Sequence, residues 1–483
     1  MCTKMNVMKV LKGLKTFKSA VLMGGLLMLA PGCDKMLEFA PGDVILAEDA
    51  INDAEDLQRL LNSNYDVLAN LLGGRAQAMS ELLSGNLARP FSSLDYTAVW
   101  YRETNFFTPT TGGVYTDFYY AINRANVVMA NFDLVDDLGE ADRLRLEAES
   151  RFVRAVCHWY LVRLWAYPYG YTADNSHLGI PLRLEANAGP SPRVSVGEVY
   201  SAIVEDFKYA EQNLPVENGP YATQDAARGF LAHIYYLQQD WAGAELAASQ
   251  IIGSSRYELG ADLDRFEAGT DSTLSADHMS SETVFGIVGG RFDVAGDTLL
   301  NDRSGAFRDN YRQDNNTNPQ LTFSDEIYNL FALNAADDRS GWMSSNGITH
   351  KVTRFDEKQY FNVPIVHLTG LHLIRAMARA QQGDTSGATD DIHQIRDRAF
   401  GEDLNDVPDG SSAEELLAIA QEEYRKENLC EGWELDQIKL RGVMGAPETI
   451  RDAPWDCPGT LLQFPNSSTT AAGFILNEEG GCL

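Results

Sequence analysis

Residues 224–253, QDAARGFLAHIYYLQQDWAGAELAASQIIG, contain two apolar segments on either side of a turn at 239–241. Apolar residues recur at steps of three and four in both segments, which predicts two helices. Residues 364–399 repeat the pattern of a helix, a tight turn and a second helix with small residues on its inner face. Small residues let two antiparallel helices approach closely. The positions with identical spacing are Ala232, Asp240, Ala244 and Ile251 in the first copy and Ala376, Asp384, Ala388 and Ile395 in the second.

This repeated hairpin resembles a tetratricopeptide helix pair. Because only two copies are present, the alternative is a chance similarity between two unrelated helical hairpins. The same periodicity continues elsewhere, for instance between a start signal at Ser195 and a stop signal at Pro215, and it indicates a mainly α chain. We predict helices at 52–72, 115–133, 148–162, 196–214, 224–238, 241–253, 364–382, 385–399 and 412–429.

Long segments between these helices are rich in Gly, Asn, Asp, Ser and Pro, which favour turns and loops. We expect them to form irregular excursions with a few short β hairpins, one of them around 283–288. The predicted fold is therefore a mainly α, tetratricopeptide-like helical-repeat scaffold with long loop excursions. The excursions lie at 73–114, 166–194, 254–363 and 432–483.

Composition sets limits on function. The chain has 483 residues, of which 44% are hydrophobic, so it can bury a sizeable core. Its 39 basic and 69 acidic residues give a net charge of −30. A nucleic-acid partner is excluded from our expectations, because binding phosphates requires basic surface. Neutral ligands or a more basic partner suit this surface better.

The N-terminus has the features of an export signal. Five lysines precede an apolar run at 20–30, which is too short to span a bilayer comfortably. The following Pro31-Gly32-Cys33 resembles a bacterial lipobox, which implies a lipoprotein signal peptide at 1–32 and lipidation of Cys33. Acyl chains on that cysteine would hold the protein on a membrane leaflet. The alternative is an ordinary secretory signal with an incidental cysteine.

Cysteine usage agrees with export. Cys457 and Cys482 bracket a C-terminal tail rich in Pro, Gly, Asn and Ser, and an oxidising compartment would let them pair. In the chain-entropy model, a disulfide that closes that segment adds ~3 kcal/mol to the free energy of unfolding. Cys157 lies in an amphipathic helix and is interpreted as a small buried hydrophobic residue.

Sequence motifs for catalysis or metal binding are absent. The chain has no GxSxG, HExxH, Walker A or strand-linked GxGxxG pattern and no CxxC or Cys/His cluster. We expect no catalytic residue, no cofactor and no resident metal, although the Asp- and Asn-rich loops leave a structural Ca²⁺ an open question. Acidic pairs are numerous, and a sequence cannot show whether two carboxylates face one another as in a glycosidase. A surface hydrolase is therefore kept as an alternative.

Aromatic residues in the loop excursions point to sugar binding. Sugar rings have apolar C–H faces that stack on aromatic rings, while neighbouring Asn and Arg side chains hydrogen-bond the hydroxyls. The alternative is that loop aromatics pack the loops onto the helical core. The candidate glycan-binding residues are Trp100, Tyr101, Arg102, Asn105, Phe106, Tyr311, Arg312, Asn315 and Trp342.

Blocks of sequence along nearly the whole exported chain resemble the SusD/RagB family of nutrient-binding outer-membrane lipoproteins. The resemblance departs from the family pattern at Tyr424 and Glu434, where arginines are common, which casts doubt on local packing there. The matching blocks, in order, are 118–126 (FYYAINRAN), 147–155 (EAESRFVRA), 159–162 (WYLV), 169–170 (YG), 179–182 (GIPL), 200–207 (YSAIVEDF), the helix pair around Asp240, Asp338-Arg339, 383–388 (GDTSGA), 395–399 (IRDRA), 461–465 (LLQFP) and Gly481-Cys482.

This resemblance implies a non-catalytic, surface-exposed lipoprotein of the outer membrane. It implies capture of an oligosaccharide and its delivery to a SusC-like TonB-dependent transporter. The alternatives are a RagB-like peptide- or protein-binding uptake component and a helical-repeat interaction scaffold.

The implied organisation is a tether at 33–50 and a single domain at 51–483. Its helical scaffold occupies about 51–72, 115–165, 195–254 and 364–430, and its loop-rich lobe occupies about 73–114, 255–363 and 432–483.

Overall fold

The computed structural model of the chain describes residues 51–90, 94–186, 189–269, 279–289, 291–292, 301–313, 318–401 and 407–482. The predicted signal peptide, Cys33, the tether up to residue 50 and Asn315 lie outside the described residues. Residues 53–483 form one compact unit. Across the described ranges, no helix is both long and apolar enough to cross a membrane.

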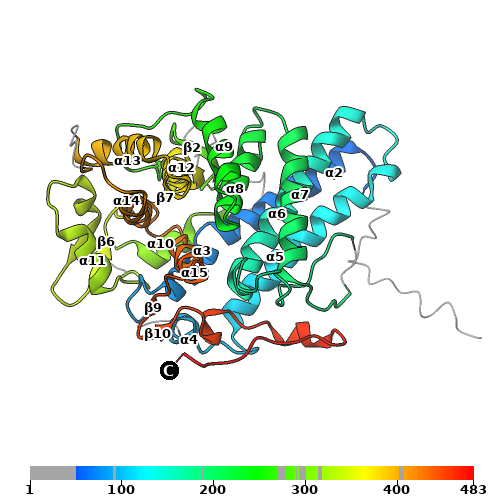
Figure 1. The fold of residues 1–483 in the computed structure, drawn as a ribbon. Helices are drawn as coiled ribbons and strands as arrows, with labels where there is room; N and C mark the ends of the chain where they lie inside the picture. The colour runs from blue at the N-terminus through cyan, green and yellow to red at the C-terminus, as the bar shows by residue number, and fades with distance from the viewer. Residues whose placement is uncertain are drawn as a thin grey trace, which may run out of the picture. The chain divides into compact units, whose positions relative to one another are not determined.

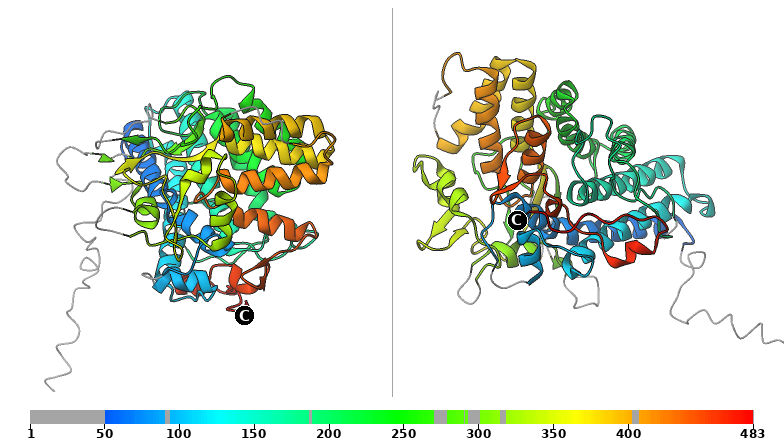
Figure 2. Two further views of the ribbon diagram at one scale, coloured as in Figure 1. Left: turned by 90° about the vertical axis from the view of Figure 1, so that its left-hand side faces the viewer. Right: turned by 60° about the horizontal axis from the view of Figure 1, so that its bottom comes forward.

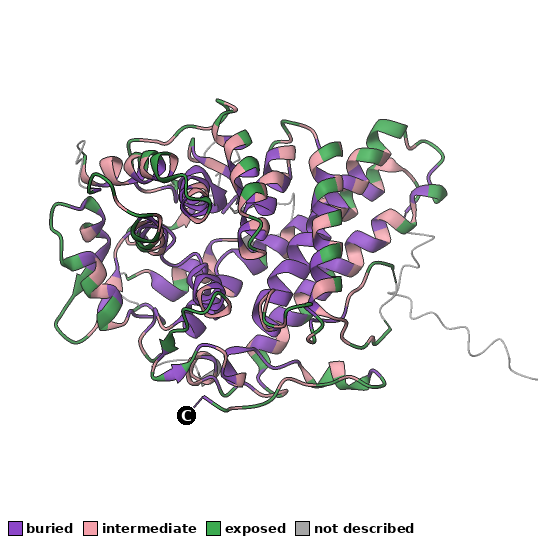
Figure 3. Ribbon diagram, viewed as in Figure 1, coloured by how far each residue is buried: buried purple, intermediate pink, exposed green. Residues whose placement is uncertain are grey.

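A series of packed helices forms the scaffold (Figure 1). Successive helices pack against one another from α5 to α9, and α12 packs against α9, α13 and α14. Figure 3 shows that buried residues line the sides along which these helices meet. The scaffold helices are α2 (Ala54–Leu72), α5 (Pro109–Ala130), α6 (Glu140–Trp165), α7 (Val196–Asn213), α8 (Gln224–Leu237), α9 (Trp241–Ile252), α12 (Leu368–Gln382), α13 (Thr385–Phe400) and α14 (Ala413–Glu427).

The two predicted hairpins, α8–α9 and α12–α13, have the same turn geometry. Asp240 and Asp384 are the N-cap residues, and each carboxylate accepts the backbone N–H three residues ahead at 3.0 Å. The residue before each cap, Gln239 or Gly383, has a positive φ (63° and 80°). The shared small residues, such as Ala244 and Ala388, are fully buried. The internal repeat predicted from the sequence is thus a repeat in structure.

Local signals fix several helix boundaries. Ser195 and Glu198 form a capping box at the start of α7, as the start signal there predicted. Helix α5 begins six residues earlier than predicted, because Pro109 occupies its first turn, where the missing N–H has no cost.

The excursions contain short helices that the periodicity did not predict. Most have seven to ten residues, which is too short for an apolar stripe to stand out. They are α3 (Arg75–Ser84), α4 (Leu94–Tyr101), α10 (Gly305–Tyr311), α11 (Asp325–Ala332) and α15 (Glu434–Val443), with 3₁₀ turns η4 (Asp338–Trp342), η5 (Pro458–Thr460) and η6 (Asn466–Thr470). A further 3₁₀ turn, η2 (Phe132–Leu134), lies between α5 and α6.

The strands form two-stranded antiparallel pairs, and one prediction about them is wrong. Residues 283–288 do not form a local hairpin, since β2 (Thr283–Ile287) pairs with β8 (Val363–His367) far along the chain. Helix α12 consequently starts at Leu368 rather than 364. The remaining pairs are β1 (Ala268–Gly269) with β7 (Tyr360–Phe361), β3 (Arg291–Phe292) with β4 (Asn301–Asp302), β5 (Met343–Ser345) with β6 (His350–Val352), and β9 (Thr449–Ile450) with β10 (Ala453–Pro454).

A buried ion-pair network joins the longest excursion to the scaffold. Arg265 and Arg339, both fully buried in the excursion, contact Glu427 of α14 at 3.2 and 2.9 Å. Arg339 also contacts Glu423 at 2.7 Å, and Arg265 contacts Glu431 at 3.3 Å. Burial alone raises the pKa of Glu427, but the surrounding guanidinium charges outweigh it and the pKa falls below the ordinary value. The carboxylate therefore stays charged in the interior.

Candidate ligand-binding site

The predicted glycan-binding residues do not form one cluster. Trp100 and Tyr101 end helix α4, and Arg102, Asn105 and Phe106 follow in the next loop. The others lie in the 255–363 excursion.

Tyr311 and Trp342 belong to the core of the loop-rich lobe. Tyr311 is fully buried at the end of α10, and its ring packs against Phe323 and Phe355. Trp342 is only 8% exposed, and the guanidinium of Arg354 covers its ring at 4.1 Å. Neither ring is free to stack on a sugar in this structure. For these two residues, the alternative that loop aromatics pack the loops onto the core describes what the structure shows.

Arg312 has a structural contact as well. Its guanidinium Nη1 donates to the backbone carbonyl of Lys358 at 3.0 Å, which links α10 to the loop before β7.

Trp100 and Tyr101 form a half-buried aromatic pair at the surface. Their rings meet edge to face, with centroids 4.9 Å apart. The indole Nε1 of Trp100 donates to the carbonyl of Leu87 at 2.9 Å, which fixes the edge of the ring. The exposed Arg89 places its guanidinium 5.5 Å from the Tyr101 ring centroid. Two rings beside a cation offer apolar faces and N–H donors together.

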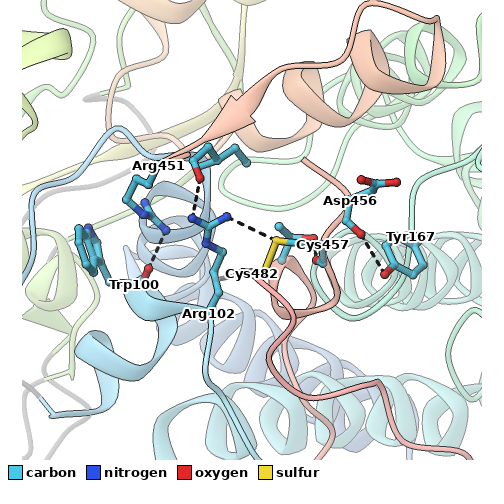
Figure 4. Close-up of a disulfide and its surroundings, with 9 residues drawn as sticks. Trp100, Arg102, Tyr167, Arg451, Asp456, Cys457 and Cys482 are labelled. Carbon is cyan, nitrogen blue, oxygen red and sulfur yellow. Dashed lines mark hydrogen bonds between the residues drawn. A yellow bond between two sulfur atoms is a disulfide. The ribbon is translucent and has the colours of Figure 1, made fainter. Parts of the chain in front are cut away.

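Arg102 faces the protein interior, unlike the hydroxyl-binding arginine that we predicted. Its Nη2 donates to the carbonyl of Ile450 at 2.5 Å, and Nη1 lies 3.5 Å from the Sγ of Cys457 (Figure 4). The side chain is buried, and burial lowers its pKa. Cys457 is joined to Cys482 in a disulfide, with Cα atoms 5.2 Å apart. Arg102 therefore connects the α4 loop to the disulfide-closed tail.

Asn105 and Phe106 shape the loop after Arg102. The side-chain oxygen of Asn105 accepts the N–H of Phe107 at 2.9 Å, and the Phe106 and Phe107 rings lie 4.2 Å apart. Phe107, which the candidate set omits, is 72% exposed and is the more accessible of the two rings.

Arg451 is the residue that sequence reasoning missed. It donates to the carbonyl of Trp100 at 2.6 Å (Figure 4) and to that of Leu82 at 3.1 Å. Its guanidinium lies 4.7 Å from the Trp100 ring centroid. Burial, followed by the charge of Arg102, lowers its pKa to about 9. No carboxylate in the described chain pairs with it. Nothing near residue 451 in the sequence points to a tryptophan some 350 residues earlier.

A concave surface lies elsewhere on the domain. Two clefts of about 440 and 240 Å³ share Tyr221 as a lining residue, and none of the predicted site residues lines either. The hydroxyl of Tyr65 accepts the N–H of Ala222 and donates to the buried Glu149, so the loop carrying Tyr221 is firmly held. Replacing Tyr221 therefore tests whether a ligand binds at these clefts and not at Trp100.

The described residues contain no cluster of three or more His, Cys, Asp or Glu side chains arranged to hold a metal ion. The arrangement at Trp100 consists of rings, amides and guanidinium groups. Its chemistry is that of stacking and hydrogen bonding.

Comparisons with known proteins agree with this architecture. Residues 45–236 match a SusD-like family described as "Starch-binding associating with outer membrane". The chain is 24% identical to SusD-like protein P25 of Formosa agariphila over 47% of this chain and 44% of that protein. It is 28% identical to the starch-binding protein SusD of Bacteroides thetaiotaomicron over 31% of this chain and 26% of that protein. The matches thus span less than half the length of these curated relatives.

Solved structures extend the likeness over most of the chain. A SusD superfamily protein of Bacteroides thetaiotaomicron has a TM-score of 0.73 at 17% identity, with 88% of this chain and 100% of that chain covered. A protein of Bacteroides vulgatus described as a putative sugar-binding protein has a TM-score of 0.70 at 20% identity, with 90% and 100% covered. At these identities the likeness establishes the fold, which is the predicted tetratricopeptide-like helical one. The family match and the curated relatives support the resemblance of this chain to the SusD-like family, and the solved structures show that it has the same fold.

Proposed function

We propose that this protein is a non-catalytic surface lipoprotein that binds an oligosaccharide and delivers it to a SusC-like TonB-dependent transporter of the outer membrane. The half-buried Trp100–Tyr101 pair beside the exposed Arg89 is the observation that carries the binding part of the proposal. The starch- and sugar-binding descriptions of the family and its relatives support the same ligand class.

The geometry suits a sugar in two ways. The aromatic faces stack on the apolar face of a pyranose ring, and the Arg89 guanidinium has five N–H donors for hydroxyl oxygens. The indole ring is held by Leu87 and Arg451, so little conformational freedom is lost on binding. Lipidation of Cys33 and the transporter partnership rest on the lipobox-like sequence and on the family resemblance.

Binding is tested with the mature protein and Trp100→Ala, using titration calorimetry against maltoheptaose and a panel of neutral oligosaccharides. By analogy with base–aromatic stacking, loss of the ring costs about 1–3 kcal/mol, or roughly 5- to 150-fold in Kd. Tyr221→Ala is the matched control, since it removes an aromatic ring from the clefts that lie away from Trp100. Weaker binding in Tyr221→Ala with unchanged binding in Trp100→Ala would move the site to the Tyr221 clefts.

A pull-down tests the partner. The lipidated protein is captured from native outer membranes in mild detergent, and co-purifying proteins are identified by mass spectrometry. Recovery of a large TonB-dependent barrel supports the uptake role. Binding of peptides but no glycan would favour the RagB-like alternative, and sugar products released by the purified protein would favour a hydrolase.

A further inference from the structure

The backbone around Trp100 is unusual. Two non-glycine residues with left-handed φ values, Arg102 (61°) and Arg451 (49°), contact Trp100 or its neighbour Val99, and a third, Asp452 (65°), follows Arg451. Side chains disfavour this conformation, so it persists where surrounding contacts impose it, and such residues gather at functional sites. The contacts that impose it here are therefore informative.

Arg451 and Asp452 form the two-residue turn between β9 and β10. Ile450 pairs with Ala453 and Thr449 with Pro454, so only these two residues connect the strands. A tight hairpin turn with two positive φ values strongly prefers Asn-Gly or Asp-Gly. Arg-Asp does not favour this turn by itself. Contacts of the turn with the rest of the protein must hold it.

The Arg451 side chain makes those contacts. Its two terminal nitrogens donate to the carbonyls of Leu82, in α3, and Trp100, in α4, so one planar group joins two helices. The same guanidinium lies over the Trp100 indole. A guanidinium is planar and forked, and it therefore bonds two oxygens and stacks on an aromatic ring at the same time.

A second contact fixes the base of the hairpin. Arg102 donates to the carbonyl of Ile450, the residue immediately before the turn, and reaches Cys457 of the disulfide. Gly459 allows this approach, because a β-carbon there would lie 2.1 Å from the Arg102 carbonyl oxygen. Figure 4 shows Arg451, Arg102 and the disulfide in succession on one side of Trp100.

We infer that the β9–β10 hairpin is a positioning device for ligand binding, in which Arg451 sets the orientation of the Trp100 ring from one side. The inference rests on the proposed function, since Trp100 is the ring that would stack on the sugar. Arg451 itself is a positioning residue. The C-terminal segment thereby determines the shape of a site whose aromatic residues come from α4.

The test follows the Trp100 ring directly and needs no ligand. The full chain is labelled with 5-fluorotryptophan, and the Trp100 resonance among the seven tryptophans is assigned with Trp100→Phe. In Arg451→Ala, the ¹⁹F resonance of Trp100 is expected to shift and broaden. In Asp452→Ala, a change in the same turn whose side chain is exposed, it is expected to stay in place.

Lysine provides the rescue variant. Arg451→Lys keeps the cation over the ring but cannot bond both carbonyls in the same plane, so it should restore the Trp100 resonance in part. If Arg451→Ala does not fold, the Trp100 resonance is compared between the wild type, Arg451→Lys and Arg451→Gln. An unchanged Trp100 resonance in a folded Arg451→Ala or Arg451→Gln would overturn the inference.

Maltoheptaose binding separates this inference from the proposed function. If both hold, Arg451→Ala weakens binding at least several-fold and Asp452→Ala does not. If the resonance moves in Arg451→Ala but Trp100→Ala binds like the wild type, the positioning role stands and the site assignment fails. If Trp100→Ala loses affinity while Arg451→Ala leaves the resonance unchanged, the site stands and the positioning role fails.

Discussion

Removing the Cys457–Cys482 disulfide should destabilise the protein by an amount that the sequence separation determines. The bond closes a separation of 25 residues. In the chain-entropy model, a loop of that size lowers the entropy of the unfolded chain by about 12 cal/mol/K, which is about 3.5 kcal/mol at 25 °C. The double variant Cys457→Ser, Cys482→Ser should therefore lose about 3.5 kcal/mol of unfolding free energy.

The tail should stay in place when the bond is absent. Gly459 and Gly480 share a backbone hydrogen bond of 2.8 Å, and Gln463 donates to the Asn477 carbonyl at 2.6 Å. Asn477 also donates to the Trp165 carbonyl at 2.9 Å. Because these contacts hold the native tail, the loss should come mainly from the greater freedom of the unfolded chain.

Urea titrations and calorimetric melts measure this loss. With an unfolding entropy of ~2.1 cal/mol/K per residue over about 430 residues, 3.5 kcal/mol corresponds to a fall in Tm of about 4 °C. Wild-type protein in reductant is the control and should match the double variant, which should not respond to reductant. Equal melting of the oxidised wild type and the double variant would refute the reasoning.

Three further perturbations have expected outcomes. Burial, reinforced by neighbouring arginine charges, lowers the pKa of His158 to about 3, so the unfolded state takes up a proton below about pH 6.5 while the folded state does not. The free energy of unfolding should therefore fall by about 2 kcal/mol between pH 7.5 and 5. Urea titrations of His158→Gln over this pH range should lack that part of the decrease. Arg339→Ala removes the guanidinium that contacts two buried glutamates, Glu423 and Glu427, and should cost up to about 3–5 kcal/mol in guanidinium titrations, and a cost below 1 kcal/mol would contradict the buried network. Gly459→Ala forces a β-carbon against the Arg102 carbonyl and should lower the Tm, whereas Gly341→Ala, which meets nothing within 4 Å, should not do so through a steric clash.

Long, periodic helices could be predicted from the sequence, and elements that depend on distant partners could not. The Asp240 and Asp384 turns have local signals, namely a capping side chain and small residues at fixed spacing. Strand β2 has no such signal for its partner, because β8 lies about 80 residues later and reads as the start of a helix. Pairing of that kind depends on tertiary contacts.

The same limit applies to the candidate site. Trp100 and Trp342 look alike in sequence, since both lie in irregular segments beside polar residues. The structure separates them by what covers each ring: Arg354 and the lobe interior enclose Trp342, whereas Trp100 stays half-buried at the surface. Arg451 could not be predicted, because its role depends on a contact across 351 residues.

The arginine–glutamate network described for the long excursion restricts how that excursion can vary. Arg265 and Arg339 are fixed points, because loss of either removes part of the positive charge that keeps Glu427 ionised in the interior. Among the described residues between them, Glu326 also contacts α14, at Arg425, but its side chain is exposed. A mutational scan should therefore find exchanges rejected at the two arginines and tolerated at exposed positions between them, such as Leu333. Variation at the exposed positions of the excursion is thus compatible with a constant connection between the excursion and the helical scaffold.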